Sequence, residues 1–303
     1  MTIGASRVFH LNVNCSDLTR SRHFYCDLLG LKPQVQTKPE APQPGGAFGL
    51  DTAQWDAWIL TDDRGFDGVA IDLLQWQEPP PAGQPYPVAN HLGFARLGLI
   101  SPDIDASYER FVAAGVDCFG PPHDVDVGGA PDIRAFVCAD PDGVPLELLS
   151  GDENRLAFVA INCSDLDRST EFYGEILGFN PLARFAPGPR DESNLRMGPG
   201  CEWEMSYLDD PRRTISFAVD LVQWHKPAGE GQPYDTANHV GIYRMALTTD
   251  DIDRDYNELV AQGVRCVSPP AELDMGPGLP LLRALLFADP DGTMLELIES
   301  PTA

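Results

Sequence analysis

The sequence predicts an α+β protein of two similar halves, each made of two modules with the element order βαβββ. The segment at residues 12–31 returns at residues 160–179 with an offset of 148, which is typical of an internal repeat. Each half alternates strand-like runs with amphipathic helices, and Gly and Pro separate the apolar runs that follow each helix. A chain of 303 residues is long enough for two domains, which we place at residues 1–150 and 151–303.

The repeat extends over nearly the whole chain. GQPYPVANHLGFAR at residues 83–96 matches GQPYDTANHVGIYR at residues 231–244, and RAFVCADPDGVPLELL at 134–149 matches RALLFADPDGTMLELI at 283–298. Because the offset grows by only one residue between these two matches, we expect the two halves to superpose as one fold.

Local signals place the first elements of each half. Residues 8–14 have the pattern of a strand, and Ser16 or Asp17 supplies the N-cap of a helix that Gly30 ends. Helical spacing predicts that the buried face of this helix consists of Phe24, Tyr25, Leu28 and Leu29.

A second helix is predicted between Asp103, its N-cap, and Gly115, where it stops. Its twin covers residues 252–263. The residues at helical spacing that form its predicted buried face are Ile104, Tyr108, Phe111 and Val112. The DPDG sequence before the final strand of each half predicts a turn.

Composition limits the class of partner. The formal net charge is −25 and the chain has only 21 Lys and Arg residues, whereas phosphate binding needs a basic surface. This argues against nucleic acid and against an anionic membrane surface. The first residues lack a signal-peptide pattern, and no apolar run approaches the length of a bilayer span. We expect a cytoplasmic monomer or homodimer whose partner is a small organic molecule.

The cysteines predict neither a thiolate zinc centre nor a disulfide framework. There are seven, an odd number, and none forms a CxxC pair. Cys15 and Cys163 stand in matching NCSD sequences just before a helix, where a helix N-terminus lowers a thiol pKa. The simpler interpretation, a small buried apolar residue, is the one we favour.

The module pattern resembles the vicinal oxygen chelate superfamily of glyoxalases, extradiol dioxygenases and bleomycin-resistance proteins. The resemblance rests on a strand followed by an SDL-type helix start, and on DPDG followed by a strand containing LEL. It implies that paired modules form glyoxalase-like, cup-shaped sheets. It also implies a divalent metal on the floor of the cup, held by side chains of the first and last strands.

In the first half, the resemblance maps the metal-ligand positions onto His10, Asp72 and Glu147. The position that holds a histidine in the dioxygenases is Arg96 instead. A guanidinium offers no lone pair to a metal, so the pattern argues against a typical extradiol dioxygenase. The equivalent positions of the second half are Phe158, Asp220, Arg244 and Glu296.

Two interpretations of these residues remain open. In the first, His10, Asp72 and Glu147 hold a divalent metal ion, with Asp220 and Glu296 as second-half equivalents. In the second, each arginine pairs with a glutamate in a metal-free cup. The modules could pair within a half or across halves, and crossing would bring His10 and Asp72 against Arg244 and Glu296.

Further candidate residues come from the ANH segments and the tryptophans. His91, at the rim of a cup, is a candidate general acid or base, but Asn90 and His91 are more simply explained as caps of a turn. Most tryptophans should pack in the core, and a few that line a cup would suit an aromatic ligand; they are Trp55, Trp58, Trp76, Trp203 and Trp224.

The sequence therefore predicts a glyoxalase-like enzyme of the lyase or isomerase type that acts on an oxygen-bearing substrate. His10, Arg96 and His91 are its candidate catalytic residues, and the cup with Phe158 would be inactive. The alternative is a non-catalytic binder of a drug or metabolite, similar to a bleomycin-resistance protein, with metal-free cups.

Overall fold

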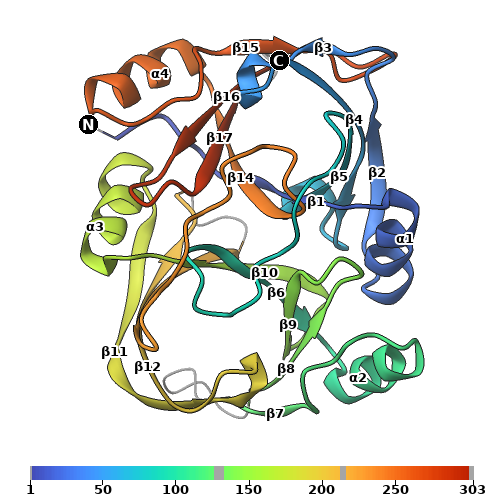
Figure 1. Ribbon diagram of the computed structural model, residues 1–303, viewed down its shortest axis with the longest axis vertical. Helices are drawn as coiled ribbons and strands as arrows, with labels where there is room; N and C mark the ends of the chain where they lie inside the picture. The colour runs from blue at the N-terminus through green and yellow to red at the C-terminus, as the bar shows by residue number, and fades with distance from the viewer. Residues whose placement is uncertain (1, 126–132, 212–215, 300–303) are drawn as a thin grey trace.

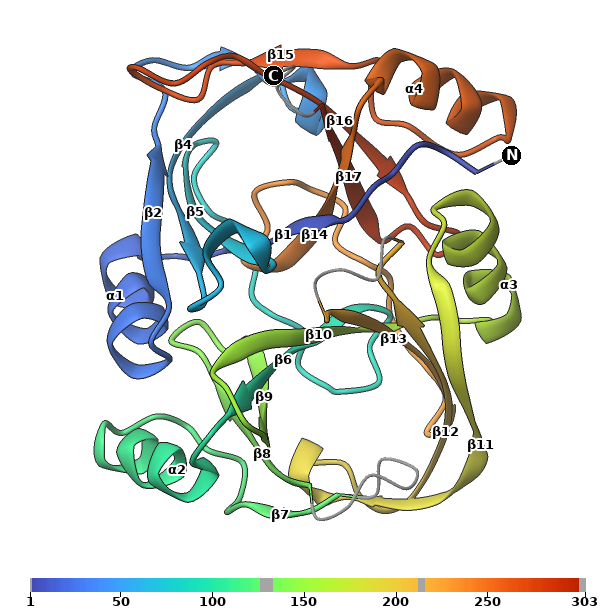
Figure 2. The ribbon, with the colours of Figure 1, turned by 180° about the vertical axis from the view of Figure 1, so that it is seen from behind.

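The computed structural model describes residues 2–125, 133–211 and 216–299. Its strands form two strongly curled sheets that lie one above the other, with the helices on their outer sides (Figure 1; Figure 2). Within the described residues, one sheet has nine strands and the other has eight. These are the cup-shaped sheets that the sequence predicts. No helix in this part of the chain has the length and apolar character needed to cross a bilayer.

Four successive modules supply the strands. The first module contains β1 (Val8–Asn14), α1 (Leu18–His23), η1 (Phe24–Leu28), β2 (Lys32–Thr37), β3 (Gln43–Pro44), η2 (Gly46–Phe48), β4 (Thr52–Thr61), η3 (Gly65–Asp67) and β5 (Ala70–Glu78). The second contains β6 (Gly93–Ser101), α2 (Ile104–Ala113), β7 (His123–Asp124), β8 (Arg134–Ala139) and β9 (Pro145–Ser150). The third contains β10 (Arg155–Asn162), α3 (Leu166–Glu171), η4 (Phe172–Ile176), β11 (Asn180–Glu192), η5 (Ser193–Leu195), β12 (Gly198–Asp209) and β13 (Ala218–Lys226). The fourth contains β14 (Gly241–Thr249), α4 (Ile252–Ala261), β15 (Ala271–Leu273), β16 (Leu282–Ala288) and β17 (Met294–Glu299).

The modules pair across the two halves. The first and fourth modules form one sheet in the order β15-β16-β17-β14-β1-β5-β4-β2, which we call the first cup. The second and third modules form the other sheet, β11-β12-β13-β10-β6-β9-β8-β7, which we call the second cup. Each cup therefore takes one module from each half, and the boundary near residue 150 lies between two modules that share a sheet.

Chain connections favour this crossed arrangement. β6 pairs in parallel with β9 and antiparallel with β10. Because β9 and β10 flank one strand, the short linker at residues 151–154 can join them directly. The two longer linkers, at residues 79–92 and 227–240, carry the chain from one cup to the other.

The predicted helix limits are confirmed. Asp17 accepts a hydrogen bond from the backbone N–H of Arg20, and Asp103 accepts one from Ala106, as N-caps do. Gly30 and Gly115 then follow the helices with φ of 81° and 75°, in the left-handed region that favours glycine.

One predicted core residue is exposed, and two others are only half-buried. Phe24, Tyr25, Leu29, Ile104 and Phe111 are buried as expected, but Val112 is 50% exposed. Val112 follows Phe111 directly, and a step of one residue turns a side chain by about 100° around the helix axis. Leu28 and Tyr108 are half-buried.

Candidate functional site

The floor of the first cup brings together four charged or ionisable side chains from four neighbouring strands. These side chains are His10 on β1, Asp72 on β5, Arg244 on β14 and Glu296 on β17. All four are at most 5% exposed. β1 lies between β5 and β14, with Asn12 beside both Asp72 and Arg244 in register. Alternate residues of a strand share a face, so His10 and Asn12 point into the same cup.

Arg244 connects the two carboxylates of this floor. Its Nε donates to Glu296 Oε2 at 2.8 Å, and its Nη2 donates to Asp72 Oδ2 at 2.9 Å. Burial alone would lower the pKa of Arg244, but Glu296 and Asp72 outweigh burial and raise it. Burial would likewise raise the pKa of Glu296, yet Arg244 and His10 lower it to about 2. The floor therefore holds a permanent cation and, at Glu296, a permanent anion.

His10 lies beside these carboxylates without a good hydrogen bond to either. Its Nε2 is 3.3 Å from Glu296 Oε2 and 3.9 Å from Asp72 Oδ2, and neither ring nitrogen has a hydrogen-bond partner. Asn12 donates to Asp72 instead, at 3.1 Å to Oδ2. The crossed pairing thus places His10 and Asp72 against Arg244 and Glu296, the set expected for that alternative.

Four polar atoms on this floor are buried and have no hydrogen-bond partner. They are Nδ1 and Nε2 of His10, Nη1 of Arg244 and Oδ1 of Asn12. Buried polar atoms are nearly always paired in folded proteins, so four free ones within one cup indicate a place where a ligand's polar atoms would bind.

The predicted metal set is not brought together. Glu147 lies on β9 in the second cup, so it cannot join His10 and Asp72, which are in the first. In its place stands Glu296, already bonded to the guanidinium of Arg244. Among the described residues, no three His, Cys, Asp or Glu side chains are arranged to hold a metal ion. The donors of the first cup therefore do not fit the divalent metal that the resemblance implies.

The second cup contains an arginine–glutamate pair, as the second interpretation of the sequence expects. Arg96 Nε donates to Glu147 Oε2 at 2.6 Å, and Phe158 occupies the position of His10, with its ring centre 5.8 Å from the Arg96 guanidinium. Arg96 therefore lies in a different cup from His10. The arginine beside His10 is Arg244, which is the equivalent of Arg96 in the repeat. Both predicted arginine–glutamate pairs are confirmed.

Asp220 is the unusual carboxyl of the second cup. Burial raises its pKa to about 7, although Arg96 opposes the shift. Its Oδ1 has no hydrogen-bond partner. Glu192, at the end of β11, accepts a hydrogen bond from the indole of Trp203 and lies near Arg96 and Glu147. Sequence reasoning missed Glu192, because its partners come from distant strands.

A cavity of about 330 Å³ opens at the second cup. Its lining includes Arg96, Phe119, Leu195, Arg196 and Tyr86. The first cup differs, because the aromatic cluster of Phe48, Trp55 and Trp76 packs within it. Phe48 lies with its ring centre 5.7 Å from the Arg244 guanidinium.

The ANH segments join the two cups rather than facing either floor. The rings of His91 and Tyr86 stack at 3.9 Å, those of Tyr86 and Tyr234 at 4.1 Å, and those of Tyr234 and His239 at 3.9 Å. His91 Nδ1 also lies 2.9 Å from the carbonyl oxygen of Leu92. This continuous stack supports the structural interpretation of His91 over a role as general acid or base.

The tryptophans and the matching cysteines are mainly structural. Trp55, Trp76 and Trp224 are buried, whereas Trp58 and Trp203 are half-buried. Burial raises the pKa of the Cys15 thiol, and it raises that of Cys163 to about 12. Neither thiol has the lowered pKa that a reactive cysteine needs.

The two cups, each built from paired βαβββ modules with an ionisable floor, define a protein of the glyoxalase-like class. The family model of the Glyoxalase/Bleomycin resistance protein/Dioxygenase superfamily matches residues 7–148 and 155–297. The chain belongs to this superfamily, and the match confirms the tandem repeat.

Similar proteins span almost the same length. The lactoylglutathione lyase of Arabidopsis thaliana is 24% identical, and the match covers 97% of this chain and 92% of that protein. The crystal structure of glyoxalase I from Zea mays has a TM-score of 0.69 at 20% identity, covering 97% of this chain and 92% of that one. A putative dioxygenase from Bacillus subtilis has a TM-score of 0.63 at 14% identity, covering 100% and 87%. The structures show a shared fold, and the lyase relatives support the expectation of a lyase or isomerase type of enzyme.

One further relative from Arabidopsis thaliana is named as a probable chloroplastic lactoylglutathione lyase, at 25% identity over 94% of this chain and 71% of that protein. The cytoplasmic location of this chain therefore stays a prediction.

Proposed function

We propose that the protein is a glyoxalase-like lyase or isomerase that acts on a small oxygen-bearing organic substrate on the floor of the first cup. The observation that carries the proposal is the group of buried polar atoms without partners on His10, Arg244 and Asn12. Unpaired polar groups cost free energy in a folded protein. They are retained where they serve binding or catalysis, and they gather here beside fixed charges of both signs.

Each residue has a distinct part in this proposal. Arg244 keeps Nη1 free to donate to a substrate oxygen while its other nitrogens hold the two carboxylates. A cation fixed in this way stabilises negative charge that develops on that oxygen. His10 accepts a proton from the substrate carbon and returns it to the neighbouring atom. Glu296 stays ionised and keeps a negative charge 3.3 Å from His10 Nε2.

We infer that a substrate reaches this floor by displacing Phe48, whose ring centre lies 5.7 Å from the Arg244 guanidinium. Its side chain is 5% exposed and packs against Trp55 and Trp76 inside the cup. η2, which carries Phe48, is a single short 3₁₀ turn at Gly46–Phe48. A substrate would take the place of this ring, and the aromatic neighbours that remain would contact its apolar part.

The named relatives suggest a first compound to test. Several are lactoylglutathione lyases, so we propose lactoylglutathione and related thiol conjugates as the first substrates to assay. Turnover should require His10 and Arg244 but not Phe158. The experiment compares wild type, His10→Gln and Phe158→Leu, with metal analysis of protein purified without chelator.

The results of this experiment are separable. Turnover that is lost in His10→Gln and kept in Phe158→Leu, with no stoichiometric metal, supports the proposal. A stoichiometric divalent metal that is lost in His10→Gln would overturn the metal-free floor. Full turnover in His10→Gln would overturn the role of His10.

A second candidate function is the non-catalytic binding of a small molecule in the second cup. The specific observation in its favour is the cavity of about 330 Å³ that Arg96 lines. A thermal-shift screen distinguishes the two functions: ligands that stabilise wild type and His10→Gln equally, but fail with Arg96→Met, would favour binding in the second cup.

A further inference from the structure

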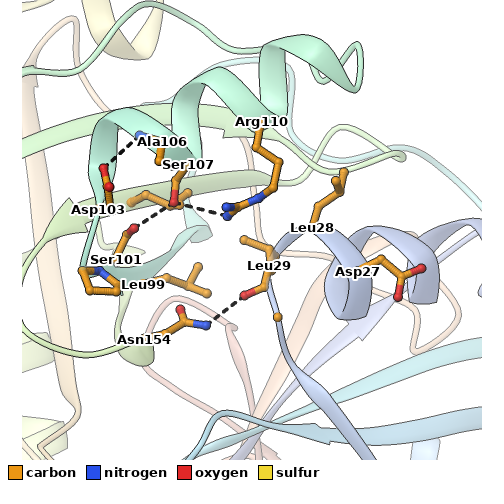
Figure 3. A pocket seen from close by; sticks show the side chains of 13 residues that line it. Asp27, Leu28, Leu29, Leu99, Ser101, Asp103, Ala106, Ser107, Arg110 and Asn154 are labelled. Atoms are coloured by element: carbon orange, nitrogen blue, oxygen red, sulfur yellow. Dashed lines mark hydrogen bonds between the residues drawn. The ribbon is translucent and has the colours of Figure 1, made fainter.

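A second cavity, of about 380 Å³, lies outside both cups between η1 and α2. Figure 3 shows Ala106, Ser107 and Arg110 of α2 on one side of it, Leu28 and Leu29 on another, and Asn154 of the linker below. The lining is mixed, with the apolar Leu28, Leu29 and Leu99 beside polar groups of Ser107, Arg110 and Asn154. We call this cavity the η1–α2 groove.

The internal repeat provides a twin of this groove between η4 and α4, and there the chain fills it. The N-terminal segment passes between α3 and α4 in both views (Figure 1; Figure 2). Ile3 donates its backbone N–H to the carbonyl of Ile176 at 2.9 Å, and its side chain is only 4% exposed. Thr2 Oγ1 donates to the carbonyl of Glu175 at 2.9 Å. An extended peptide with an aliphatic side chain therefore fits the twin.

The acceptors that hold this segment have counterparts in the η1–α2 groove. With the offset of 148, Glu175 and Ile176 correspond to Asp27 and Leu28, both of which line the cavity. The chain approaches this groove differently, because the linker comes directly from β9 and Gly151 donates to the carbonyl of Ser101. The place that Ile3 takes in the twin is therefore left open.

Two substitutions within the repeat change which segment fits. In the twin, a Cβ on Gly4 would lie 1.9 Å from Arg254 Nη2 and 3.2 Å from Asp255 Oδ2, so a larger residue fits there only if the Arg254 side chain moves aside. The corresponding residues of the η1–α2 groove are Ala106 and Ser107, which are far smaller. A larger side chain has room at that position.

The repeat also reverses a charge one turn further along α2. Arg110 stands where the twin has Glu258, one helical turn beyond Ala106 and on the same face of α2. Its Nη2 donates to Ser107 Oγ at 3.2 Å, and the side chain lines the cavity. The lining also contains two carboxylates, but Asp27 pairs with His23, and Asp103 caps α2 by accepting from the backbone N–H of Ala106. Arg110 is therefore the cation beside the open position, next to an aliphatic floor.

We propose that the η1–α2 groove binds an extended segment of a partner protein that carries an aliphatic residue followed by an acidic one. The aliphatic side chain packs on Leu28 and Leu99, as Ile3 packs in the twin. A backbone N–H group of the segment donates to a carbonyl group of η1, as that of Ile3 does to η4 in the twin. The acidic side chain pairs with Arg110. The chain's own N-terminal segment is not the occupant, because it is held in the twin.

The test uses three acetylated and amidated peptides and the full-length protein. The peptides are Thr-Ile-Gly-Ala-Ser, which copies residues 2–6, and its variants with Asp or Lys in place of Gly. Isothermal calorimetry should show one site and an affinity order of Asp, then Gly, then Lys. We expect at least about a tenfold difference between the Asp and Lys peptides, since one charge pair separates them.

Three variants locate the site. Ala106→Trp should fill the groove and weaken binding of the Asp peptide by at least about tenfold. Glu109→Trp, on an exposed part of the same helix, should leave this affinity unchanged. Arg110→Glu restores the residue of the twin and should reverse the preference between the Asp and Lys peptides. Melting temperatures confirm that each variant folds.

Several outcomes would overturn the proposal. They are no binding of the Asp peptide at millimolar concentration, binding that Ala106→Trp leaves unchanged, and an affinity order that Arg110→Glu does not alter. Sedimentation that shows a dimer of wild type but a monomer of Ala106→Trp would assign the groove to a second copy of this chain instead.

Discussion

The Nε atom of Arg244 donates a 2.8 Å hydrogen bond to Glu296, inside a cup where both side chains are at most 5% exposed. The bond joins neighbouring strands of the fourth module, and the same guanidinium reaches Asp72 of the first module. One side chain thus ties together two modules that lie at opposite ends of the sequence.

Replacing Arg244 should therefore destabilise the whole first cup. Arg244→Met leaves Asp72 and Glu296 buried without their cation, and breaking a buried pair in this way costs about 3 to 5 kcal/mol. The matched change, Arg96→Met, should cost less, because the Arg96 and Glu147 side chains are 17% and 11% exposed. Urea unfolding of both variants at neutral pH measures the difference, and equal losses would contradict it.

Acid should weaken the first cup through Glu296. The folded pKa, about 2, lies below the ordinary pKa of 4.5 for a glutamate, so the folded state binds fewer protons than the unfolded state between these values. The stability from this group is present above pH 4.5 and is lost as the pH falls towards 2. In Glu296→Gln this part of the acid sensitivity should disappear, which unfolding curves between pH 2 and 7 would reveal.

Asp220 should act in the opposite direction. Its folded pKa of about 7 exceeds the ordinary pKa of 3.8 for an aspartate, so stability is lost as the pH rises from about 4 through 7. Asp220→Asn avoids this loss and should melt at a higher temperature than wild type at pH 8, with little difference at pH 4. The twin change, Asp72→Asn, is the control: it removes an ion pair with Arg244 and should lower the melting temperature at pH 8.

His10→Ala and Phe158→Ala should separate chemistry from packing. His10→Ala should abolish turnover with little change in melting temperature, since it removes a group that lacks hydrogen-bond partners in the fold. Phe158→Ala should leave turnover intact but cost roughly 3 to 5 kcal/mol, because it removes a buried ring. Activity and melting temperature of both variants decide the matter, and wild-type activity in His10→Ala would leave the small-molecule binder as the better interpretation.

His91→Ala and His239→Ala should behave alike. Each removes one outer ring from the stack through Tyr86 and Tyr234, and each should lower the melting temperature by a similar amount without a selective loss of turnover. A loss of turnover in His91→Ala alone would instead assign it a catalytic role.

The sequence by itself determined the local structure and the kinds of side chain that the site can use. The repeat, the N-caps Asp17 and Asp103, and the stops at Gly30 and Gly115 depend on neighbouring residues, so they can be inferred without knowing the fold. The same is true of the arginine that replaces a metal ligand in each half, since the chemistry of a guanidinium does not depend on context.

Only the tertiary structure decided which of these residues meet. Glu147 and Glu296 are equivalent in sequence, yet Glu296 stands beside His10 while Glu147 lies in the other cup. Both pairing schemes bury the same apolar faces, so hydrophobic pattern cannot distinguish them. The choice depends on how the linkers at residues 79–92, 151–154 and 227–240 connect the sheets, and on contacts between strands far apart in the chain. For the same reason Glu192 and the η1–α2 groove, which depend on distant segments, had no signal in the sequence.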